Sequence, residues 1–175
     1  MNEVIKAMEE RRSIRSFKPD MPSAEDLDKI IEAGLYAPSG MGRQASIIVA
    51  VTNKEVRDRL SDVNRAIGGW GEGFDPFYGA PAILIVLANK EYPTYLYDGS
   101  LTMGNMMNAA YSLGLGSIWI HRAKEEFCQD EWKALLNDLG VEGDFEGIGH
   151  CAVGYMEGEL SAPPARNEGR VFYVK

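Results

Sequence analysis

The apolar run APAILIVLA, residues 80–88, decides the fold of this 175-residue chain. Nine apolar residues in a row after a glycine-rich segment are typical of a strand in the core of a sheet. A second run, IIVAV at residues 47–51, predicts another buried strand. SIWI at residues 117–120 and the stretch at residues 150–155 predict a third and a fourth strand. The sequence therefore predicts a four-stranded sheet at the centre of the protein.

Helices are predicted between these strands. Ser23 and Asp26 resemble a capping box, and the apolar residues that follow recur at helical spacing as far as about Tyr36. Asn53 is a typical N-cap for a helix after the strand at residues 47–51. Further helices are predicted at residues 3–10, 93–116 and 125–139. The helix at residues 93–116 is apolar on most sides, so we expect protein to bury it all round.

The order of these elements favours an α+β fold, because strands and helices mix without strict βαβ alternation. We expect a sheet that is covered by helices. No repeat, low-complexity tract or linker divides the chain, so residues 1–175 are interpreted as a single domain.

The apolar residues near the C-terminus pose a burial problem. RVFYV, residues 170–174, ends an arm that contains Pro163 and Pro164, and terminal arms usually fray. Extended apolar residues are buried when a sheet edge receives them as an additional strand. We expect this edge to belong to a second copy of the chain, which predicts a homodimer.

Composition limits the classes of partner. The net charge of -8 argues against nucleic acids and anionic membrane surfaces, because both attract positive protein surfaces. No apolar run is long enough for a transmembrane helix, and the charged N-terminal segment lacks the apolar core of a signal peptide. We therefore expect a cytoplasmic protein without a nucleic-acid or membrane partner.

Common catalytic motifs are missing. The sequence contains neither a GxGxxG after a strand nor GxxxxGK[ST], GxSxG or HExxH. The two histidines and the cysteines Cys128 and Cys151 have no metal-ligand spacing and no disulfide framework. We therefore expect no bound metal and no catalytic side chain, so that a bound cofactor would carry any difficult chemistry.

The segment RRSIRSF, residues 11–17, places three arginines and Ser13 together in an acidic chain. Guanidinium groups match phosphate oxygens, and the Ser13 hydroxyl adds a donor. In an extended conformation, residues 11, 13 and 15 would project to one side. Arg166, Arg170 and Lys175 form a second basic cluster. The segment is either a solvated basic patch or a binding site for a small anion such as a phosphate.

Four segments together resemble the nitroreductase family of FMN-dependent enzymes. They are RRSIRSF at residues 11–17, APSGMGRQASIIVAV at 37–51, GAPAILIVLA at 79–88, and AAYSLGLGSIWIHR at 109–122 with the tail PPARNEGRVFYV at 163–174. The resemblance implies a mixed, mainly antiparallel sheet between helices in three α/β/α layers. It also implies a homodimer with a C-terminal arm exchanged between subunits and FMN at their interface.

The resemblance implies roles for the basic residues. Arg11 and Ser13 would bind the FMN phosphate with Arg12 beside them, and Arg166, joined by Arg170, would complete the cradle. Arg15 would reach the ribityl chain or the N1/C2 carbonyl edge of the flavin. Positive charge at that edge stabilises the negative charge of reduced flavin.

Two backbone segments are implied to contact the flavin ring. Pro38, Ser39 and Gly40 would line it from the partner subunit, with Gln44 nearby. The strand exit would lie against one face, and a backbone N–H there would donate to flavin N5 or O4; this exit comprises Trp119, Ile120, His121 and Arg122. We assign no proton transfer to His121.

The glycine-rich segment at residues 68–79 is predicted to be a loop with four aromatic residues, Trp70, Phe74, Phe77 and Tyr78. These rings either anchor an irregular segment in the core or form a lid that stacks on flat aromatic substrates.

The resemblance implies an FMN-dependent NAD(P)H oxidoreductase with a ping-pong cycle. Hydride would pass from NADH or NADPH to flavin N5, and then to a small-molecule acceptor such as a nitroaromatic or a quinone. Two alternatives stay open among flavoproteins: a non-catalytic FMN-binding or storage module, and an enzyme like the flavin-dependent reductive dehalogenases. A third alternative is an anion-binding structural domain without flavin.

Overall fold

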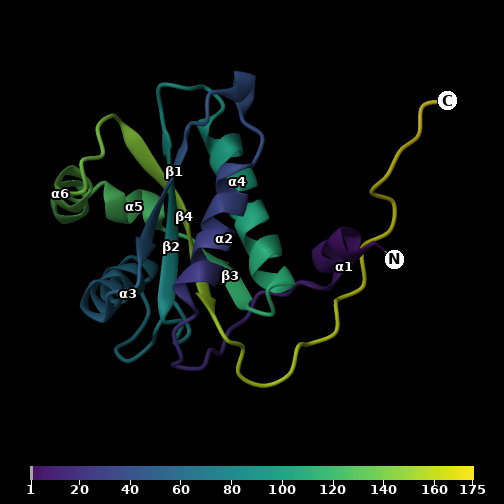
Figure 1. The fold of residues 1–175 in the computed structure, drawn as a ribbon, viewed down its shortest axis with the longest axis horizontal. Helices are drawn as coiled ribbons and strands as arrows, with labels where there is room; N and C mark the ends of the chain where they lie inside the picture. The colour runs from purple at the N-terminus through teal and green to yellow at the C-terminus, as the bar shows by residue number, and fades with distance from the viewer. Residues whose placement is uncertain (1) are drawn as a thin grey trace.

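The computed structural model describes residues 2–175 and contains, within them, a four-stranded antiparallel sheet between two layers of helices (Figure 1). The strands are β1 (Ser46–Val51), β2 (Ala82–Asn89), β3 (Gly116–Ile120) and β4 (Phe145–Gly154). They lie in the order β1-β2-β4-β3, so β1 and β3 are the edge strands. The four predicted strands and the α+β class are confirmed, although β4 begins earlier than the sequence pattern predicts.

The helices are α1 (Glu3–Glu10), α2 (Ala24–Leu35), α3 (Lys54–Gly68), α4 (Tyr95–Ser112), α5 (Ala123–Phe127) and α6 (Asp130–Asp138). Two predicted N-caps are confirmed. The Ser23 hydroxyl accepts a hydrogen bond from Asp26 N at 3.0 Å, and Asn53 Oδ1 accepts one from Val56 N at 3.1 Å. Each cap satisfies a backbone donor that the first helical turn leaves without a partner.

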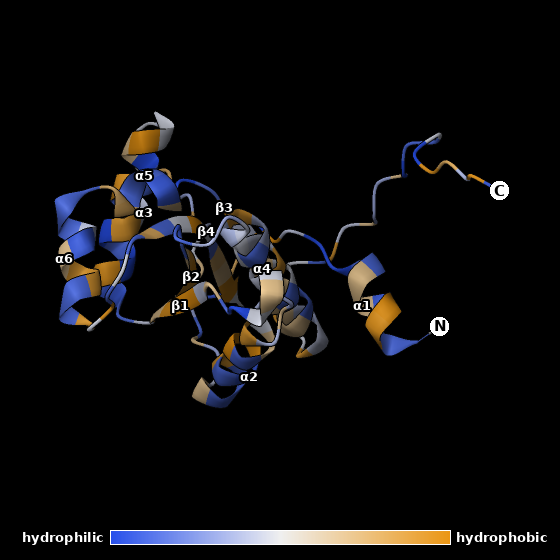
Figure 2. Cartoon of the chain, turned by 90° about the horizontal axis from the view of Figure 1, so that it is seen from above, coloured by the Kyte–Doolittle hydropathy of each residue, from blue (hydrophilic) through white to orange (hydrophobic). Residues whose placement is uncertain are grey.

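The sheet separates two hydrophobic clusters. Along β2, Ile83, Ile85 and Leu87 face the cluster beneath α3, α5 and α6, whereas Leu84 and Val86 face the cluster beneath α2 and α4. Because successive side chains in a strand point to opposite faces, one apolar run supplies both clusters. Figure 2 shows the strands between the two groups of helices. The long apolar run thus predicted correctly that β2 is covered on both faces.

The prediction of one helix at residues 125–139 is wrong, because the structure has two short helices there. Gln129 adopts an extended conformation with φ -81° and ψ 146°, and this separates α5 from α6. The break turns both helices toward the core, where the rings of Phe127 and Trp132 lie 6.2 Å apart. A continuous helix would satisfy the same apolar spacing, so the pattern alone does not reveal the break.

The expectation that α4 is buried all round is also wrong within a single chain. Leu96, Tyr97 and Leu101 are exposed, and all three lie in the first two turns of the helix. On its other face, Met103 and Met106 are fully buried against the sheet. The chain therefore covers the sheet-facing side of the helix and leaves apolar residues of its first two turns exposed.

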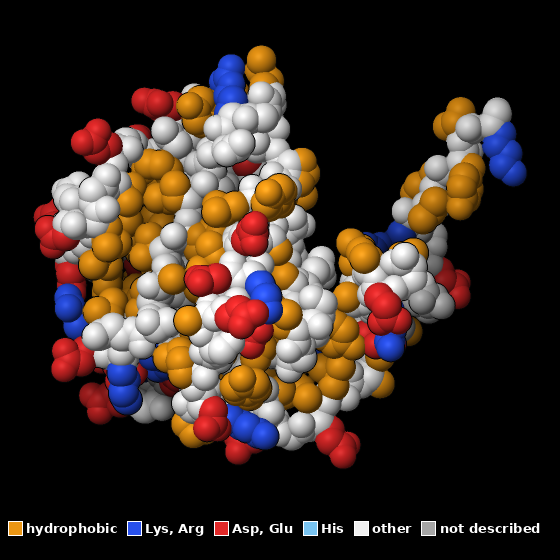
Figure 3. Space-filling view, in the orientation of Figure 1, with side chains coloured by type: hydrophobic (Ala, Val, Ile, Leu, Met, Phe, Trp, Pro, Cys, Tyr) orange, Lys and Arg blue, Asp and Glu red, His pale blue; other side chains and the backbone are white. Residues whose placement is uncertain are grey.

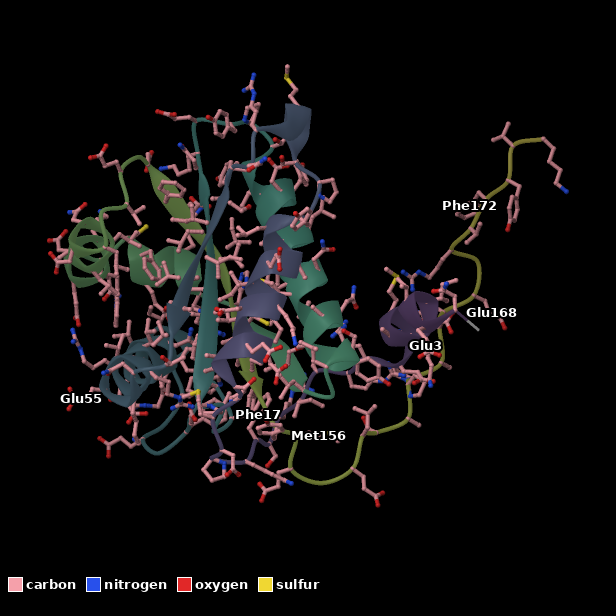
Figure 4. The ribbon with its side chains drawn as sticks, in the orientation of Figure 1. Glu3, Phe17, Glu55, Met156, Glu168 and Phe172 are labelled. Carbon is pink, nitrogen blue, oxygen red and sulfur yellow. The ribbon has the colours of Figure 1, made fainter. Side chains whose placement is uncertain are left out.

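The C-terminal tail leaves the body of the protein after Met156. Met156 pairs with Phe17 through an isolated antiparallel bridge, and the two side chains lie beside each other where the tail departs (Figure 4). Residues 157–175 form no strand, and Phe172 lies on the tail well away from the sheet. The apolar run at residues 171–174 is exposed. No helix within residues 2–175 has the length and apolarity needed to cross a membrane.

The two cysteine thiols should differ in reactivity. Cys151 lies in β4 with no exposed surface, and burial raises the pKa of its thiol to about 12. Cys128 is exposed. Since the thiolate is the reactive form, we expect a thiol reagent at pH 8 to modify only Cys128 in the native protein, and both cysteines after unfolding. Native Cys128→Ser should then react hardly at all. Rapid modification of this variant would contradict the burial of Cys151.

Candidate functional site

The segment RRSIRSF lies along the edge of the sheet. Ser13 forms a parallel bridge with Ser117 of β3, and Ile14 N donates to Ser117 O at 3.1 Å. The side chains of Ile14 and Phe17 are buried in the core, which anchors the segment at two points. Gly116 is needed at the start of β3, because a Cβ there would lie 2.8 Å from Ile14 Cγ1. The edge of β3 thus positions the basic residues.

A cleft of about 590 Å³ opens between α1, the C-terminal end of α4 and the start of β3. Lys6, Arg11 and Arg12 line it on the basic side, with Glu3 at the same surface. Met156 and Leu160 contribute apolar surface where the tail begins. Figure 3 shows the notch that separates α1 from the body of the protein. The cleft therefore combines a cationic lining with apolar walls.

Arg11 and Arg12 have different surroundings within this cleft. Among residues 2–175, neither forms a salt bridge. Arg11 Nη1 has only a long contact with Met107 Sδ, at 4.0 Å. Arg12 Nη1 donates to the carbonyls of Glu9 and Arg11, at 2.7 and 2.5 Å, and so caps the end of α1. Of these two arginines, Arg11 is therefore the one whose guanidinium is free to bind an anionic ligand.

Two buried polar atoms in the cleft wall have no hydrogen-bond partner. They are Arg12 Nε and Ser117 Oγ, and both residues line the cleft. Buried donors normally have partners in native proteins. Such atoms beside the Arg11 guanidinium fit a ligand that carries several acceptor oxygens, as a phosphate ester does.

The other predicted phosphate ligands are less well gathered. Ser13 and Arg15 are exposed beside the cleft and do not belong to its lining. Arg166 and Arg170 are exposed on the tail, also outside the lining. Their roles stay predictions.

The loop at residues 38–44 is tightly held but lies at the other end of α4. Gly40 N donates to Asp98 Oδ1 at 3.0 Å, and Gln44 N donates to Ser39 Oγ at 2.9 Å. Met41 and Gln44 have positive φ angles of 56° and 51°, which non-glycine residues rarely adopt. Helical rise places residue 98 about 20 Å from residue 111 at the cleft. One chain therefore does not bring Pro38–Gln44 to its own cleft.

The glycine-rich loop is anchored at its C-terminal end. Asp75 accepts hydrogen bonds from the Arg57 guanidinium, from Ser61 Oγ at 2.7 Å and from Gly79 N at 2.8 Å. Phe77 is fully buried and packs against the His150 ring at 5.3 Å, so it is a core residue. This end of the loop matches the interpretation as a core anchor.

The rest of the loop carries an exposed aromatic group. Trp70 and Phe74 are half-exposed with ring centroids 4.9 Å apart, and Tyr78 packs edge-on against Phe74 at 6.0 Å. The Arg122 guanidinium lies over the Trp70 ring at 4.3 Å, which links the loop to the exit of β3. Three of the four predicted aromatic residues are therefore together at this surface.

The exit of β3 places its residues in different environments. Ile120 is buried, Trp119 and Arg122 are half-buried, and His121 is exposed. Arg122 has a positive φ of 80° and is the N-cap residue of α5. A buried cluster beneath this exit, made of Asn64, Glu126 and His150, was not anticipated from the sequence. Its members lie on three elements, so no local spacing connects them.

Comparisons with known proteins point to one family. The model of the nitroreductase family matches residues 8–67. A protein of Archaeoglobus fulgidus named as an NADH dehydrogenase/NAD(P)H nitroreductase is 29% identical over 164 residues, which are 91% of this chain and 88% of that protein. A crystal structure of a nitroreductase with bound FMN from Bacteroides fragilis is 30% identical, covers 100% of both chains and has a TM-score of 0.88. A nitroreductase with bound FMN from Desulfitobacterium hafniense is 29% identical, also covers 100% of both chains and has a TM-score of 0.89.

Replacing Asp75 should destabilise the protein in a pH-dependent manner. Burial alone raises the pKa of Asp75, but hydrogen bonds from Arg57, Ser61 and Gly79 N outweigh it and hold the pKa below its ordinary value. This ionised carboxylate contributes stability above about pH 4, and the contribution is lost as the pH falls through the folded-state pKa. We expect Asp75→Asn to lower the free energy of unfolding at pH 7 by about 2 kcal/mol.

Urea unfolding at a series of pH values measures this effect. The difference between wild type and Asp75→Asn should shrink below about pH 4. Asp62→Asn is a matched control, because Asp62 is an exposed carboxylate whose partner is Arg65 on the same helix. A difference that does not change with pH would contradict the role of the Asp75 charge.

Proposed function

The chain belongs to the nitroreductase family, and on this premise we propose that it is an FMN-dependent NAD(P)H oxidoreductase. The observation that carries the proposal is the Arg11 guanidinium, which faces the cleft without an acidic partner among the described residues. Family membership supports FMN as the cofactor, and its phosphate would bind at this position. The net charge of -8 makes a basic cleft unusual on this surface and favours a small anion over a polyanion.

The residues of the cleft would bind the phosphate end of FMN. Arg11 supplies the free charge, and Arg12 Nε and Ser117 Oγ are buried polar atoms without partners. Ser13 and Arg15 are exposed on the same segment, and Arg15 supplies positive charge for the edge of the flavin ring. Arg166 and Arg170 would join the phosphate from the tail. Apolar surface from Met156 and Leu160 limits the access of water to these ion pairs.

Bound FMN would supply the hydride chemistry between NADH or NADPH and a nitroaromatic or quinone acceptor in a ping-pong cycle. The protein residues orient the cofactor and balance its charge. The exit at Trp119–Arg122 would hold the flavin ring with its backbone. Trp70 and Phe74 offer flat surfaces to an aromatic acceptor, and the stacking of Arg122 on Trp70 holds them beside the exit.

A homodimer would complete the site. A second copy could cover three exposed apolar surfaces: the start of α4, α1 and the tail at residues 171–174. The loop at residues 38–44 lies about 20 Å along α4 from its own cleft, as expected if it serves the partner's flavin. Exchange of the C-terminal arm would bury the apolar tail on the partner.

The visible absorption spectrum of the FMN-loaded protein tests the function. We expect bound flavin that loses its visible absorption band under anaerobic NADH or NADPH and regains it when a quinone or nitroaromatic is added. The reductant that works at the lower concentration identifies the preferred donor. Flavin that remains oxidised with both nucleotides would support a storage module. Failure to bind FMN would contradict the proposal.

Removal of residues 161–175 tests the exchanged arm. This deletion keeps the hydrogen bond from Ser16 Oγ to Glu157 at 2.9 Å and removes the exposed apolar run. Each large apolar side chain that is buried contributes about 2 kcal/mol, so the loss should weaken the dimer by several orders of magnitude. Sedimentation at micromolar concentration should show a dimer for the full chain and mainly monomer for the deletion. Equal masses would contradict arm exchange.

A further inference from the structure

Three polar side chains are fully buried beneath the exit of β3. Asn64 of α3, Glu126 of α5 and His150 of β4 each have no exposed surface. Asn64 Nδ2 donates to Glu126 Oε1 at 2.6 Å, and the other carboxylate oxygen lies 2.6 Å from His150 Nε2. The proposed function uses none of these groups. Because burying such groups costs free energy even when they are paired, their position calls for an explanation.

Both ends of this chain of hydrogen bonds reach the backbone of the exit. Asn64 Nδ2 also donates to the carbonyl of His121 at 2.9 Å, and His150 Nδ1 lies 3.3 Å from the carbonyl of Ile120. Two consecutive carbonyls are therefore held by side chains from different elements. The next residue, Arg122, adopts a positive φ of 80°.

Close packing restrains the same backbone from β4. A Cβ at Gly147 would lie 2.2 Å from the carbonyl oxygen of Ala123, so only glycine permits this approach. The backbone after β3 thus packs against Gly147 of β4. Its carbonyls at Ile120 and His121 contact the buried side chains of His150 and Asn64. These contacts together leave the backbone at residues 120–123 little freedom to move.

The geometry also limits how protons can be arranged on the His150–Glu126 pair. Both nitrogens of His150 face acceptors, so both can bond only when the His150–Glu126 pair carries two protons. Two arrangements satisfy this condition: both protons on the histidine beside a carboxylate, or one on each residue. The net charge of the pair is zero in both. A glutamine at position 126 could donate to Nε2 of a neutral His150 and accept from Asn64, which would preserve every bond. Methionine at this position has a similar size and preserves none of them.

We propose that Asn64, Glu126 and His150 are positioning residues that fix the exit of β3 in the conformation that holds the flavin ring. The proposal rests on the proposed function, since FMN is the group that this backbone would contact. Because the cluster contacts the carbonyls of Ile120 and His121, it fixes the orientation of these two peptide groups and of the N–H groups that belong to them. It also fixes Arg122, whose guanidinium lies on Trp70. The cluster therefore acts on the cofactor through the backbone, without touching it.

Paired substitutions of Glu126 separate positioning from packing. We expect Glu126→Met to accelerate amide hydrogen exchange at residues 120–123 by about tenfold in the cofactor-free protein, as expected for the loss of buried hydrogen bonds. It should also weaken FMN binding by about tenfold and shift the visible flavin spectrum. Glu126→Gln should match the wild type in all three measurements. Similar behaviour of the two variants would overturn the proposal, because packing alone does not distinguish glutamine from methionine.

Two further variants keep the test decisive. Asn64→Leu is nearly isosteric and should reproduce the faster exchange if Glu126→Met fails to fold. Thr102→Val is the matched control: Thr102 is buried on the opposite face of the sheet, where its hydroxyl donates to Asp98 O at 3.1 Å. It should leave exchange at residues 120–123 and FMN binding unchanged. An equal effect of Thr102→Val would mean that general destabilisation explains the result, which would also overturn the proposal.

The exchange measurement remains informative if the proposed function fails. A wild-type protein that binds no FMN would contradict the function, while slow exchange at residues 120–123 and its loss in Glu126→Met would still establish the backbone clamp. FMN binding and spectra that are the same in wild type and Glu126→Met would contradict positioning and leave the proposed function intact.

Discussion

The hydrogen bond from Ile14 N to Ser117 O, 3.1 Å long, fastens the basic N-terminal segment to the edge of the sheet. The rest of the candidate site depends on this pairing. It brings Arg11 to the cleft at the start of β3, while the burial of Ile14 and Phe17 prevents the segment from detaching. The other end of β3 leads into the exit that Asn64 and His150 contact. One five-residue strand therefore connects the proposed phosphate site with the proposed flavin contact.

Several apolar surfaces of the single chain are not covered by other parts of the chain. Large apolar side chains are exposed at the start of α4, on α1 and on the tail. The loop at residues 38–44 is held firmly by Asp98, yet it lies far from the cleft of its own chain. A rigid loop and an exposed apolar tail have a common explanation if two copies share two sites. The proposed dimer would then be a condition for binding the cofactor as well as for burying apolar surface.

Features determined by local sequence were predictable. Ser23 and Asn53 cap the predicted helices, and the apolar run in β2 forms one of the two inner strands. Helix caps and strand burial could be predicted because they depend on neighbouring residues. The break between α5 and α6 was missed, since apolar spacing is satisfied with or without it. The cluster of Asn64, Glu126 and His150 was missed because its members are far apart in sequence and meet only after folding. The identification of the basic segment with FMN came from the resemblance, since the arginines alone fit either a solvated patch or any small anion.

The most direct test of the account is the affinity for FMN compared with riboflavin, measured by fluorescence titration of wild type and Arg11→Met. If Arg11 binds the phosphate, wild type should prefer FMN, and the substitution should weaken FMN binding by about tenfold to a hundredfold with little effect on riboflavin. Lys133→Met, on the exposed surface of α6, removes the same charge away from the cleft and should leave both affinities unchanged. Equal loss of both ligands in Arg11→Met, or no loss of either, would contradict a phosphate site in this cleft.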